Sequence, residues 1–391
     1  MKKYVLAVMV ASASAAPCEE SCGAPRVQER AEIVWTKAIC KEPGRYIGWP
    51  TVCKAGNGDL IAVFSGDRDE HICPFGKVQM VRSADGGMTW SGPENVCNSI
   101  IDDRDAGIVA TDDGTLVMSW FTSIEYRGYI PPRSKLSPGS PKFYWRLHDE
   151  KLPWPEVKKQ LGAFTRRSTD CGKTWEAPVR TPCSAPHGPV QLKDGRLLYV
   201  GKSGDVDRSD LGKGVGKIVA AESTDKGRSW RVIGEIPFPK QINVLRECHE
   251  PHAVETSDGR IVALTRCHHK GDGFLGSVQS ESLDGGKTWT EARPVGLYGF
   301  PPHLTRLADG RLLAVYCRRW GEVGEFACLS DDGGRTWDTK NEIKLAGHWN
   351  EDLGYPASVQ MADGSILTVY YQAENKGEKT CLMGTLWRVT K

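Results

Sequence analysis

The sequence of 391 residues has no long apolar run beyond its first residues and no excess of either charge. Lys and Arg total 51 against 49 Asp and Glu, which leaves a net charge of +2. A charge this close to zero gives no electrostatic basis for binding nucleic acid or an anionic membrane surface. Because no stretch approaches the roughly 18 apolar residues of a membrane span, we expect no membrane insertion. Glycine, at 43 residues, and tryptophan, at 13, favour a turn-rich all-β chain.

The first residues are typical of an export signal. Lys2 and Lys3 precede the apolar stretch Tyr4–Val10, and Ala13-Ser14-Ala15 fits a small-residue cleavage site. We therefore expect a signal peptide over 1–15, an N-terminal segment over 16–29, and an exported protein that is periplasmic or secreted. The 13 cysteines are an odd number, so at least one has no partner within the chain, and Cys18 and Cys22 are close enough to bridge.

One turn pattern, Ser-x-Asp-x-Gly-x-Thr/Ser-Trp, is repeated along the chain. Its copies begin at Ser83, Ser168, Ser223, Ser282 and Ser330. In such a turn the Ser and Asp side chains bind local backbone groups, the Gly supplies a positive φ, and the Trp begins the next strand. Repetition at intervals of this length indicates an architecture of repeated units.

A second pattern, an Asn-Gly or Asp-Gly turn before an apolar run, alternates with the first. Its copies begin at Asn57, Asp113, Asp194, Asp258, Asp309 and Asp363. Each unit then contains two hairpins, which is the four-stranded blade of a propeller. We predict an all-β fold: a six-bladed β-propeller with four-stranded antiparallel blades over residues 30–391. The last unit lacks the Ser-Asp turn, so the N-terminal strand Ala31–Lys37 is predicted to close the ring and remove an open edge.

An insertion of about 124–163 interrupts the second blade between its second and third strands. It is rich in Pro, aromatic and basic residues, and Pro155–Leu161 is predicted to be a short helix. A loop of this length in a compact domain is often functional.

The turn pattern also locates a candidate site. Both kinds of turn lie on one face of the ring, so the first strands begin on the opposite face, near the axis. The residues eight positions before each Asn or Asp of the second pattern are Trp49, Asp105, Pro186, Glu250, Pro301 and Tyr355. Two positions further on are Thr51, Gly107, Gly188, His252, His303 and Ala357, and the second strands end near Arg68, Lys202, Arg266, Arg318 and Arg319. Carboxylates, a Tyr, His and Arg on one face indicate a functional pocket; a solvated rim is the alternative.

These segments resemble those of the sialidase (neuraminidase) family, six-bladed propeller glycosidases with repeated Asp boxes. Gly354-Tyr355-Pro356-Ala357 is similar to the segment with the family's nucleophilic Tyr, and Glu250-Pro-His-Ala-Val-Glu255 to the segment with its Glu base. Arg266 matches an Arg that binds the substrate carboxylate. Two departures concern that carboxylate: Gly48 stands where the family has an Arg, and the third Arg is not in register, although Arg318 or Arg319 could reach the same space.

The resemblance implies an exported bacterial enzyme, a retaining exo-glycosidase that hydrolyses terminal sialic acid or a related acidic sugar from glycans. It implies Tyr355 as nucleophile, Glu250 as its base, and no cofactor. Asp69 is the first choice for the acid, and Asp105, placed by the blade arithmetic, is the second. The residues expected to bind the glycan are Arg68, Arg266, Arg318, His187, His252, His303 and Trp49.

Other readings of the same residues stay open. Cys248-His249-Glu250-Pro251-His252 and Cys267-His268-His269 look like metal clusters, but no paired zinc-type spacing accompanies them, so we expect no metal. A propeller polysaccharide lyase, or another glycosidase acting on a uronate or rhamnose-type glycan, would use Tyr and His as base and acid. A carbohydrate-binding propeller without catalysis would need no Tyr355–Glu250 pair.

Overall fold

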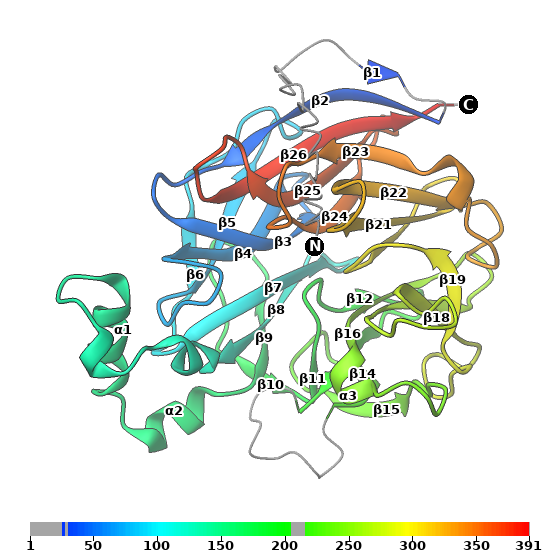
Figure 1. Cartoon of the computed structure of the whole chain (residues 1–391). Helices are drawn as coiled ribbons and strands as arrows, with labels where there is room; N and C mark the ends of the chain where they lie inside the picture. Colours follow the sequence, from blue (N-terminus) through cyan, green and yellow to red (C-terminus); the bar gives the residue numbers. More distant parts are fainter. Residues whose placement is uncertain (1–25, 28–29, 205–215, 391) are drawn as a thin grey trace, which may run out of the picture.

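Six antiparallel sheets stand around a common axis in the computed structural model, which describes residues 26–27, 30–204 and 216–390 (Figure 1). The predicted six-bladed β-propeller is therefore confirmed. The expected signal peptide and the Cys18–Cys22 bridge lie outside the described residues. Every cysteine within the described ranges is a free thiol.

The first three blades follow one another along the chain. Blade one has β3 (Tyr46–Lys54), β4 (Leu60–Arg68), β5 (Lys77–Ser83) and β6 (Glu94–Cys97). Blade two has β7 (Asp102–Ala110), β8 (Leu116–Ser123), β9 (Ala163–Ser168) and β10 (Val179–Thr181). Blade three has β11 (Cys183–Ser184), β12 (Val190–Gln191), β13 (Leu197–Ser203), β14 (Ile218–Ser223) and β15 (Arg231–Glu235).

The other three blades complete the ring. Blade four has β16 (Cys248–Glu255), entered through the short helix α3 (Val244–Glu247), then β17 (Ile261–Cys267), β18 (Gly276–Ser282) and β19 (Arg293–Leu297). Blade five has β20 (His303–Arg306), β21 (Leu312–Arg318), β22 (Gly324–Ser330) and β23 (Ile343–Gly347). Blade six has β24 (Gly354–Gln360), β25 (Ile366–Ala373) and β26 (Thr380–Val389).

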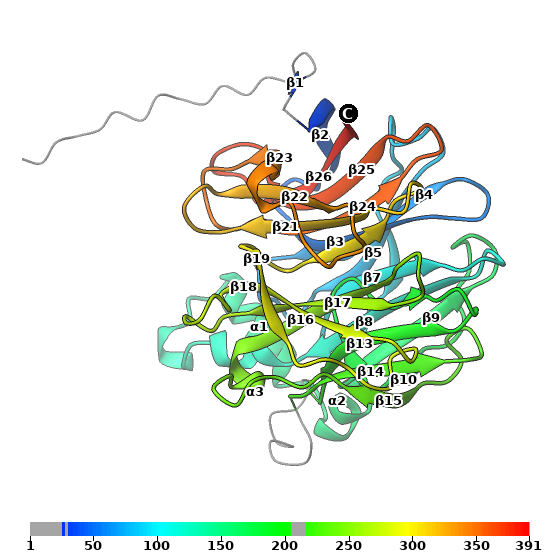
Figure 2. The same ribbon diagram turned by 90° about the vertical axis from the view of Figure 1, so that its right-hand side faces the viewer.

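The N-terminal strand β2 (Ala31–Cys40) closes the ring, as predicted. It pairs antiparallel with β26 from Ala31 opposite Val389 to Cys40 opposite Leu382, and the two-residue strand β1 (Arg26–Val27) pairs with its outer edge. Figure 2 shows β2 and β26 side by side next to the C-terminus. Each of these strands thus satisfies main-chain groups that would otherwise form an open sheet edge.

The Ser-Asp turns are closed by the same hydrogen bonds in all five copies. In the blade-four turn, Ser282 Oγ donates to Asp284 Oδ1 at 2.9 Å, and the Thr288 amide donates to the same oxygen at 2.9 Å. The Gly286 amide donates to Ser282 Oγ at 2.8 Å. Because these turns and the Asp-Gly turns both join an outgoing strand to a returning one, they share one face, and the strand starts lie on the other.

The insertion in the second blade projects from the side of the ring (Figure 1). It contains the 3₁₀ turns Glu125–Tyr129 and Arg133–Lys135 and the helices α1 (Pro141–Asp149) and α2 (Trp154–Gln160). Its own small core includes Tyr126, Trp145 and Val157, all fully buried. Within the described ranges, no helix has both the length and the apolar character to cross a membrane.

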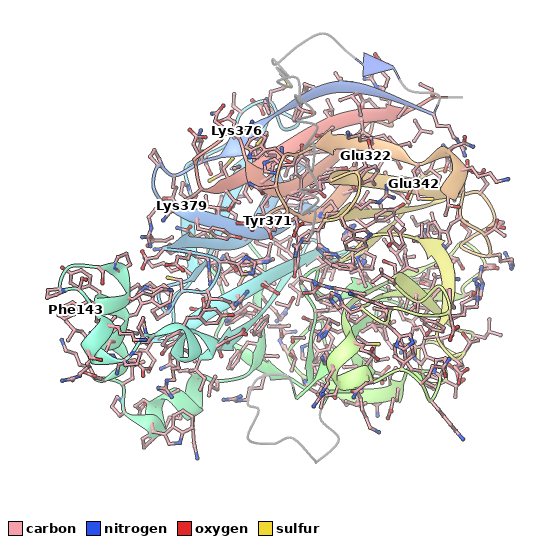
Figure 3. All side chains as sticks on the ribbon, in the orientation of Figure 1. Phe143, Glu322, Glu342, Tyr371, Lys376 and Lys379 are labelled. Carbon is pink, nitrogen blue, oxygen red and sulfur yellow. The ribbon has the colours of Figure 1, made fainter. Side chains whose placement is uncertain are left out.

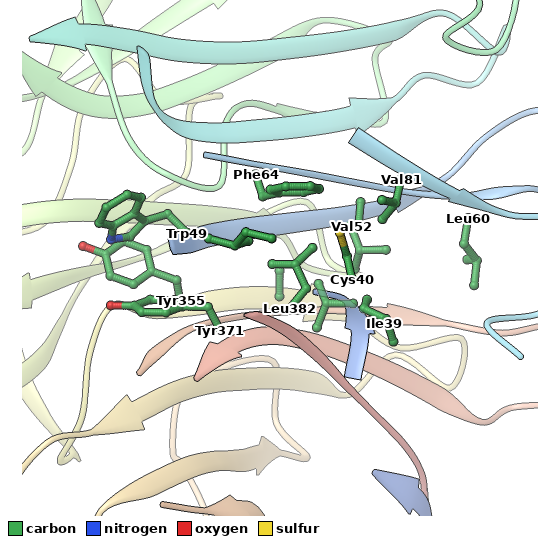
Figure 4. Close-up of a cluster of buried hydrophobic side chains, with 14 of the residues drawn as sticks. Ile39, Cys40, Trp49, Val52, Leu60, Phe64, Val81, Tyr355, Tyr371 and Leu382 are labelled. Carbon is green, nitrogen blue, oxygen red and sulfur yellow. The ribbon is translucent and has the colours of Figure 1, made fainter. Parts of the chain in front are cut away.

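A hydrophobic cluster between blades six and one extends to the axis. Figure 4 shows it running from Leu60 and Val81 to Trp49, Tyr355 and Tyr371, whose rings lie together at one end. The two tyrosine hydroxyls point the same way, out of the apolar cluster. The core therefore ends at the residues that the sequence marked as a candidate site.

Replacing Trp387 by Ala should destabilise the ring closure. The indole is fully buried on β26, opposite Ile33 of β2, and its Nε1 donates to Thr368 Oγ1 at 2.9 Å. Loss of the ring leaves a cavity, which costs about 3–5 kcal/mol in the free energy of unfolding. Urea unfolding measures this cost. Trp349→Ala, at a residue 46% exposed, is the control and should leave the midpoint nearly unchanged.

Candidate active site

The inner strands of four blades carry the same backbone distortion at the position counted from the turns. Trp49, Asp105, Glu250 and Tyr355 have φ values of 55°, 51°, 51° and 55°, and each lies at a register shift in its strand. A non-glycine residue in this left-handed region costs about 1–3 kcal/mol. A bulge turns a side chain away from the direction that the regular strand would give it. The distortion is thus a shared device that places four chemically distinct side chains near the axis.

A short hydrogen bond joins two of these residues across the ring. Tyr355 Oη donates to Glu250 Oε1 at 2.5 Å, and Arg266 Nη1 donates to Glu250 Oε2 at 2.5 Å. The same Arg266 nitrogen lies 3.5 Å from Tyr355 Oη. The structure thus brings together three residues that the sequence predicted for one site, from blades six and four.

The two acids of this group have opposite protonation preferences. Burial acts to raise the pKa of Glu250, but the Arg266 charge and the Tyr355 hydrogen bond outweigh it and lower that pKa to about 2. Burial, followed by the nearby Glu250 charge, raises the pKa of Tyr355 well above its usual value. The resting pair is a phenol donating to a carboxylate, which is the arrangement of a nucleophile beside its base.

Arg319, on the connection after β21, brings a second guanidinium to Tyr355. Its charged carbon lies 5.8 Å from the centre of the Tyr355 ring, and its Nη2 donates to Tyr371 Oη at 3.2 Å and to the Leu353 carbonyl at 2.9 Å. Arg266 Nε donates to His268 Nε2 at 2.8 Å. Among the described residues, none accepts a hydrogen bond from Arg266 Nη2 or Arg319 Nη1, so both keep donors for a ligand.

Arg104 is a third guanidinium, and one that the sequence analysis did not single out. It lies over the Trp49 ring at 4.6 Å and is 7% exposed. Its nearest carboxylates, on Asp102, Asp105 and Glu125, are each 3.9 Å away, beyond hydrogen-bond distance. Arg104 Nε and Asp105 Oδ1 are both buried without a partner in the described chain. Buried polar atoms left without a hydrogen bond in this way are costly, and a ligand hydroxyl, which can accept from Arg104 Nε and donate to Asp105 Oδ1, would satisfy both.

The two candidate acids have different surroundings. Burial, reinforced by Glu250 and opposed by Arg104, raises the pKa of Asp105 to about 7. Asp69 instead accepts hydrogen bonds from Arg45 at 2.6 Å and from Trp145 Nε1 at 2.7 Å. Although burial acts to raise the pKa of Asp69, these bonds lower it. Asp69 therefore anchors the insertion as a carboxylate, and these two partners do not suit the acid role expected of it.

Two of the predicted substrate arginines are also engaged elsewhere. Arg68 is fully buried behind Trp49, and its Nη1 and Nη2 donate to the two oxygens of Asp102 at 2.6 and 2.8 Å. Arg318 packs over the Phe326 ring at 4.2 Å and donates to Glu342 at 2.8 Å. Each guanidinium is thus held by a carboxylate of another element, and Arg104 and Arg319 are the two that lie beside Trp49 and Tyr355.

The three predicted histidines pack against one another beside Tyr355 and are almost fully buried. The rings of His252 and His303 are stacked 4.4 Å apart, and His187 lies 5.0 Å from His303 and 6.3 Å from Tyr355. Burial lowers the pKa of all three, that of His187 to about 3, so they are neutral. Their contacts with sugar hydroxyls stay a prediction, and a purely structural role would also fit this packing.

Trp49 has no free face either. It is 1% exposed, with Arg68 and Arg104 within 5.0 and 4.6 Å of its ring, and so cannot stack on a sugar as expected. In Figure 3, Tyr371, a neighbour of this site, lies near the middle of the six blades, whereas Phe143 of the insertion lies at the edge of the molecule.

The supposed metal clusters separate into other contacts. The Cys248 and Cys267 thiols face each other at 4.0 Å, and the rings of His249 and His268 are 5.9 Å apart. Within the described part of the chain, no group of three or more His, Cys, Asp or Glu side chains is arranged to hold a metal ion.

Comparison with known proteins agrees with the fold. A family profile described as a BNR repeat-like domain matches residues 146–369. A curated Bacteroides fragilis protein named sialidase is 23% identical over an alignment of 357 residues that covers 83% of this chain and 59% of that relative. This chain thus spans less than two thirds of the relative's length.

Solved structures repeat the finding. A Dyadobacter fermentans protein of unknown function has a TM-score of 0.73 at 24% identity, with 92% of this chain and 99% of that one covered. The intramolecular trans-sialidase from Ruminococcus gnavus, in complex with oseltamivir carboxylate, has a TM-score of 0.61 at 14% identity, with 88% and 94% covered. At these identities the likeness establishes the fold alone.

Asp105→Asn should stabilise the protein, and more so at pH 8 than at pH 5. The pKa of Asp105 in the folded state, about 7, exceeds the ordinary value of 3.8. The stability it contributes is therefore present at low pH and is lost as the pH rises through 7. Thermal unfolding at the two pH values measures the difference. Asp69→Asn is the contrasting control: because the pKa of Asp69 is lowered, its replacement should destabilise the protein at pH 8.

Proposed function

We propose, from the premise that this chain belongs to the family of BNR repeat-like domain proteins, that it is a retaining exo-glycosidase acting on a terminal sialic acid or a related acidic sugar of a glycan. The observation that carries the proposal is the 2.5 Å hydrogen bond from Tyr355 to the Glu250 carboxylate beside three guanidiniums. The names of the Bacteroides fragilis relative and of the Ruminococcus gnavus structure point to the same substrate class.

The tyrosine suits an anionic sugar for an electrostatic reason. A carboxylate nucleophile would be repelled by a carboxylate on the anomeric carbon, whereas a phenol is neutral until it attacks. In the first step Tyr355 Oη bonds to the anomeric carbon as its proton passes to Glu250, and the leaving group departs with the electron pair of the broken bond. Water then releases the sugar, and Glu250 returns the proton to Tyr355.

Arg266 links substrate binding to the strength of this base. In the free protein its charge holds the pKa of Glu250 near 2, which makes the carboxylate a weak base. A substrate carboxylate that binds Arg266 offsets this charge and so raises the pKa of Glu250. Glu250 then accepts the Tyr355 proton more readily in the complex than in the free protein.

Arg104, Arg266 and Arg319 together support the choice of an anionic substrate. Each is largely buried, and each keeps at least one N–H without an acceptor in the described chain. Glu250 forms a close pair with Arg266 alone, and the N–H groups left without an acceptor offer an anion further charge-assisted hydrogen bonds. The protonated form of Asp105, present below about pH 7, adds a neutral hydrogen-bond donor to a sugar oxygen.

A binding-only propeller would not need the hydrogen bond between Tyr355 and Glu250, so that bond favours catalysis. We also propose that the protein is exported, because Lys2, Lys3 and the apolar stretch Tyr4–Val10 have the pattern of a signal peptide. Detection of the mature protein outside the cytoplasm, with its N-terminus near residue 16, tests export.

Tyr355→Phe should abolish hydrolysis while leaving the fold intact. The variant removes only the nucleophilic oxygen, so we expect kcat to fall at least about 10³-fold. Fluorophore release from aryl glycosides of sialic acid, its deaminated analogue, glucuronic acid and rhamnose measures activity, and circular dichroism checks the fold. The control is Tyr126→Phe, which breaks a similar bond to a carboxylate, Asp149 at 3.0 Å, within the insertion. Wild-type rates in Tyr355→Phe would disprove the nucleophile.

Arg104→Gln should weaken binding of the acidic sugar. A hydrogen bond to a charged group contributes about 1.5–3 kcal/mol, so we expect KM to rise about 10- to 100-fold. The matched control is Arg318→Gln, which removes a guanidinium paired with Glu342 and should leave KM within about twofold. Equal effects of the two variants would mean that Arg104 does not touch the substrate. The measurement is steady-state kinetics on the substrate that the wild type cleaves.

A further inference from the structure

The residues assigned above leave one step without a donor: the leaving group needs a proton. The leaving group must point toward solvent, because it carries the rest of the glycan, which extends out of the protein. Asp105 is only 7% exposed, with Arg104 and Glu250 as its strongest charged neighbours, so it lies deep in the site rather than at its solvent side. Asp69 is occupied by Arg45 and Trp145. A proton donor for the leaving group has to be found at the solvent side of Tyr355.

His71, on the connection between β4 and β5, has the position and the contacts for this role. Its side chain is 46% exposed. Its ring meets the Trp49 indole edge-on, with centres 4.8 Å apart at 86°, and Trp49 in turn meets Tyr355 edge-on at 6.4 Å. His71 and the nucleophile therefore contact the same indole, and His71 is the more exposed of the two.

A phenol and a carboxylate hold the His71 ring in one orientation. Tyr46 Oη donates to Asp352 Oδ1 at 2.7 Å and lies 2.9 Å from His71 Nδ1. Since Tyr46 has only one proton, its oxygen accepts from His71 Nδ1–H. His71 Nε2 has no partner among the described side chains and is the nitrogen left to exchange protons.

Tyr46 and Asp352, the two residues behind the His71 imidazole, keep the protonation states that these hydrogen bonds require. Burial raises the pKa of Tyr46 well above its usual value, so the phenol stays protonated. Burial acts to raise the pKa of Asp352 too, but His71, whose Nδ1 lies 3.6 Å from Asp352 Oδ1, and the Tyr46 hydrogen bond lower it, so Asp352 stays a carboxylate. An imidazolium at His71 is thus stabilised through Tyr46 by a full negative charge.

Charges from three elements face His71. Burial lowers the pKa of His71, Asp352 from the β23–β24 connection raises it, and Arg104 of β7 and Arg68 of β4 lower it. A substrate anion on Arg104 offsets one of the repulsive charges. Binding of the acidic sugar therefore favours the protonated imidazole at the moment when a proton is needed.

We propose that His71 protonates the leaving-group oxygen, an inference that rests on the proposed glycosidase function. As the anomeric C–O bond breaks, its electron pair stays on the leaving oxygen, which takes the proton from His71 Nε2. In the second step His71 Nε2 takes a proton from the attacking water, whose oxygen bonds to the anomeric carbon as the bond to Tyr355 breaks. Tyr46 and Asp352 are positioning residues, and the net reaction is hydrolysis.

The test compares leaving groups, because only the loss of an acid depends on them. The variant is His71→Gln, assayed on two glycosides of the acidic sugar that the wild type cleaves. One has a 4-methylumbelliferyl leaving group, which departs as a weakly basic phenolate, and the other is a disaccharide with an alcohol leaving group. We expect kcat/KM to fall less than about 10-fold on the aryl glycoside and about 10²- to 10⁴-fold on the disaccharide.

Two further variants separate catalysis from packing. Tyr46→Phe keeps the aromatic contacts of residue 46 but removes the hydroxyl that binds His71 and Asp352. It should lower kcat on the disaccharide more than on the aryl glycoside. His348→Gln removes a histidine of the neighbouring β23–β24 connection that binds the Ala373 carbonyl at 3.0 Å, and it should change neither substrate's rate.

The outcomes distinguish this inference from the function on which it rests. If the wild type hydrolyses no acidic glycoside in a Tyr355-dependent way, the proposed function fails and His71 has no leaving group to protonate. If hydrolysis depends on Tyr355 and His71→Gln slows both glycosides equally or neither, only the His71 inference is overturned. A selective loss on the disaccharide supports both.

Discussion

The left-handed bulge on the inner strands is the constraint on which this site depends. In a regular strand, successive side chains alternate between the two faces of a blade, so none would be directed along the axis. At Trp49, Asp105, Glu250 and Tyr355 the backbone leaves that alternation, and the side chains of different blades meet. The ring of six sheets, closed by β2, supplies the rigidity that holds these strained positions.

The sequence predicted most of the fold because its signals are local. Each hairpin is specified by a turn of a few residues, such as Asp258-Gly259 or the Ser282 turn, and the six-fold repetition makes the blade count unambiguous. The same counting located Glu250 and Tyr355, because the distance from turn to bulge is fixed by the length of the strand. Arg266 was found from its place at the end of the paired strand.

The sequence did not show which charged groups would neutralise one another. Arg68 and Arg104 both lie over the ring of the same tryptophan. Asp102, from the blade next to that of Arg68, accepts hydrogen bonds from both terminal nitrogens of Arg68, and the Arg104 side chain is left without a hydrogen bond in the described chain. The partner of Asp69 was equally hidden in the sequence. Its carboxylate accepts a hydrogen bond from Trp145 of the insertion, which is 76 residues away in the chain. His71 is on a connection with no turn motif, so counting from the repeats could not locate it.

The pairing of β2 with β26 also decides how the ring responds to tension on its two ends. Ala31 lies opposite Val389, so the first and last strands of the ring begin and finish side by side. A force that separates these ends loads the outermost pair of main-chain hydrogen bonds first and then each next pair in turn. Thermal opening of this closure must break all the hydrogen bonds between β2 and β26 together. Under a pulling force the same bonds break one pair after another, so the propeller resists force least where its first and last strands meet.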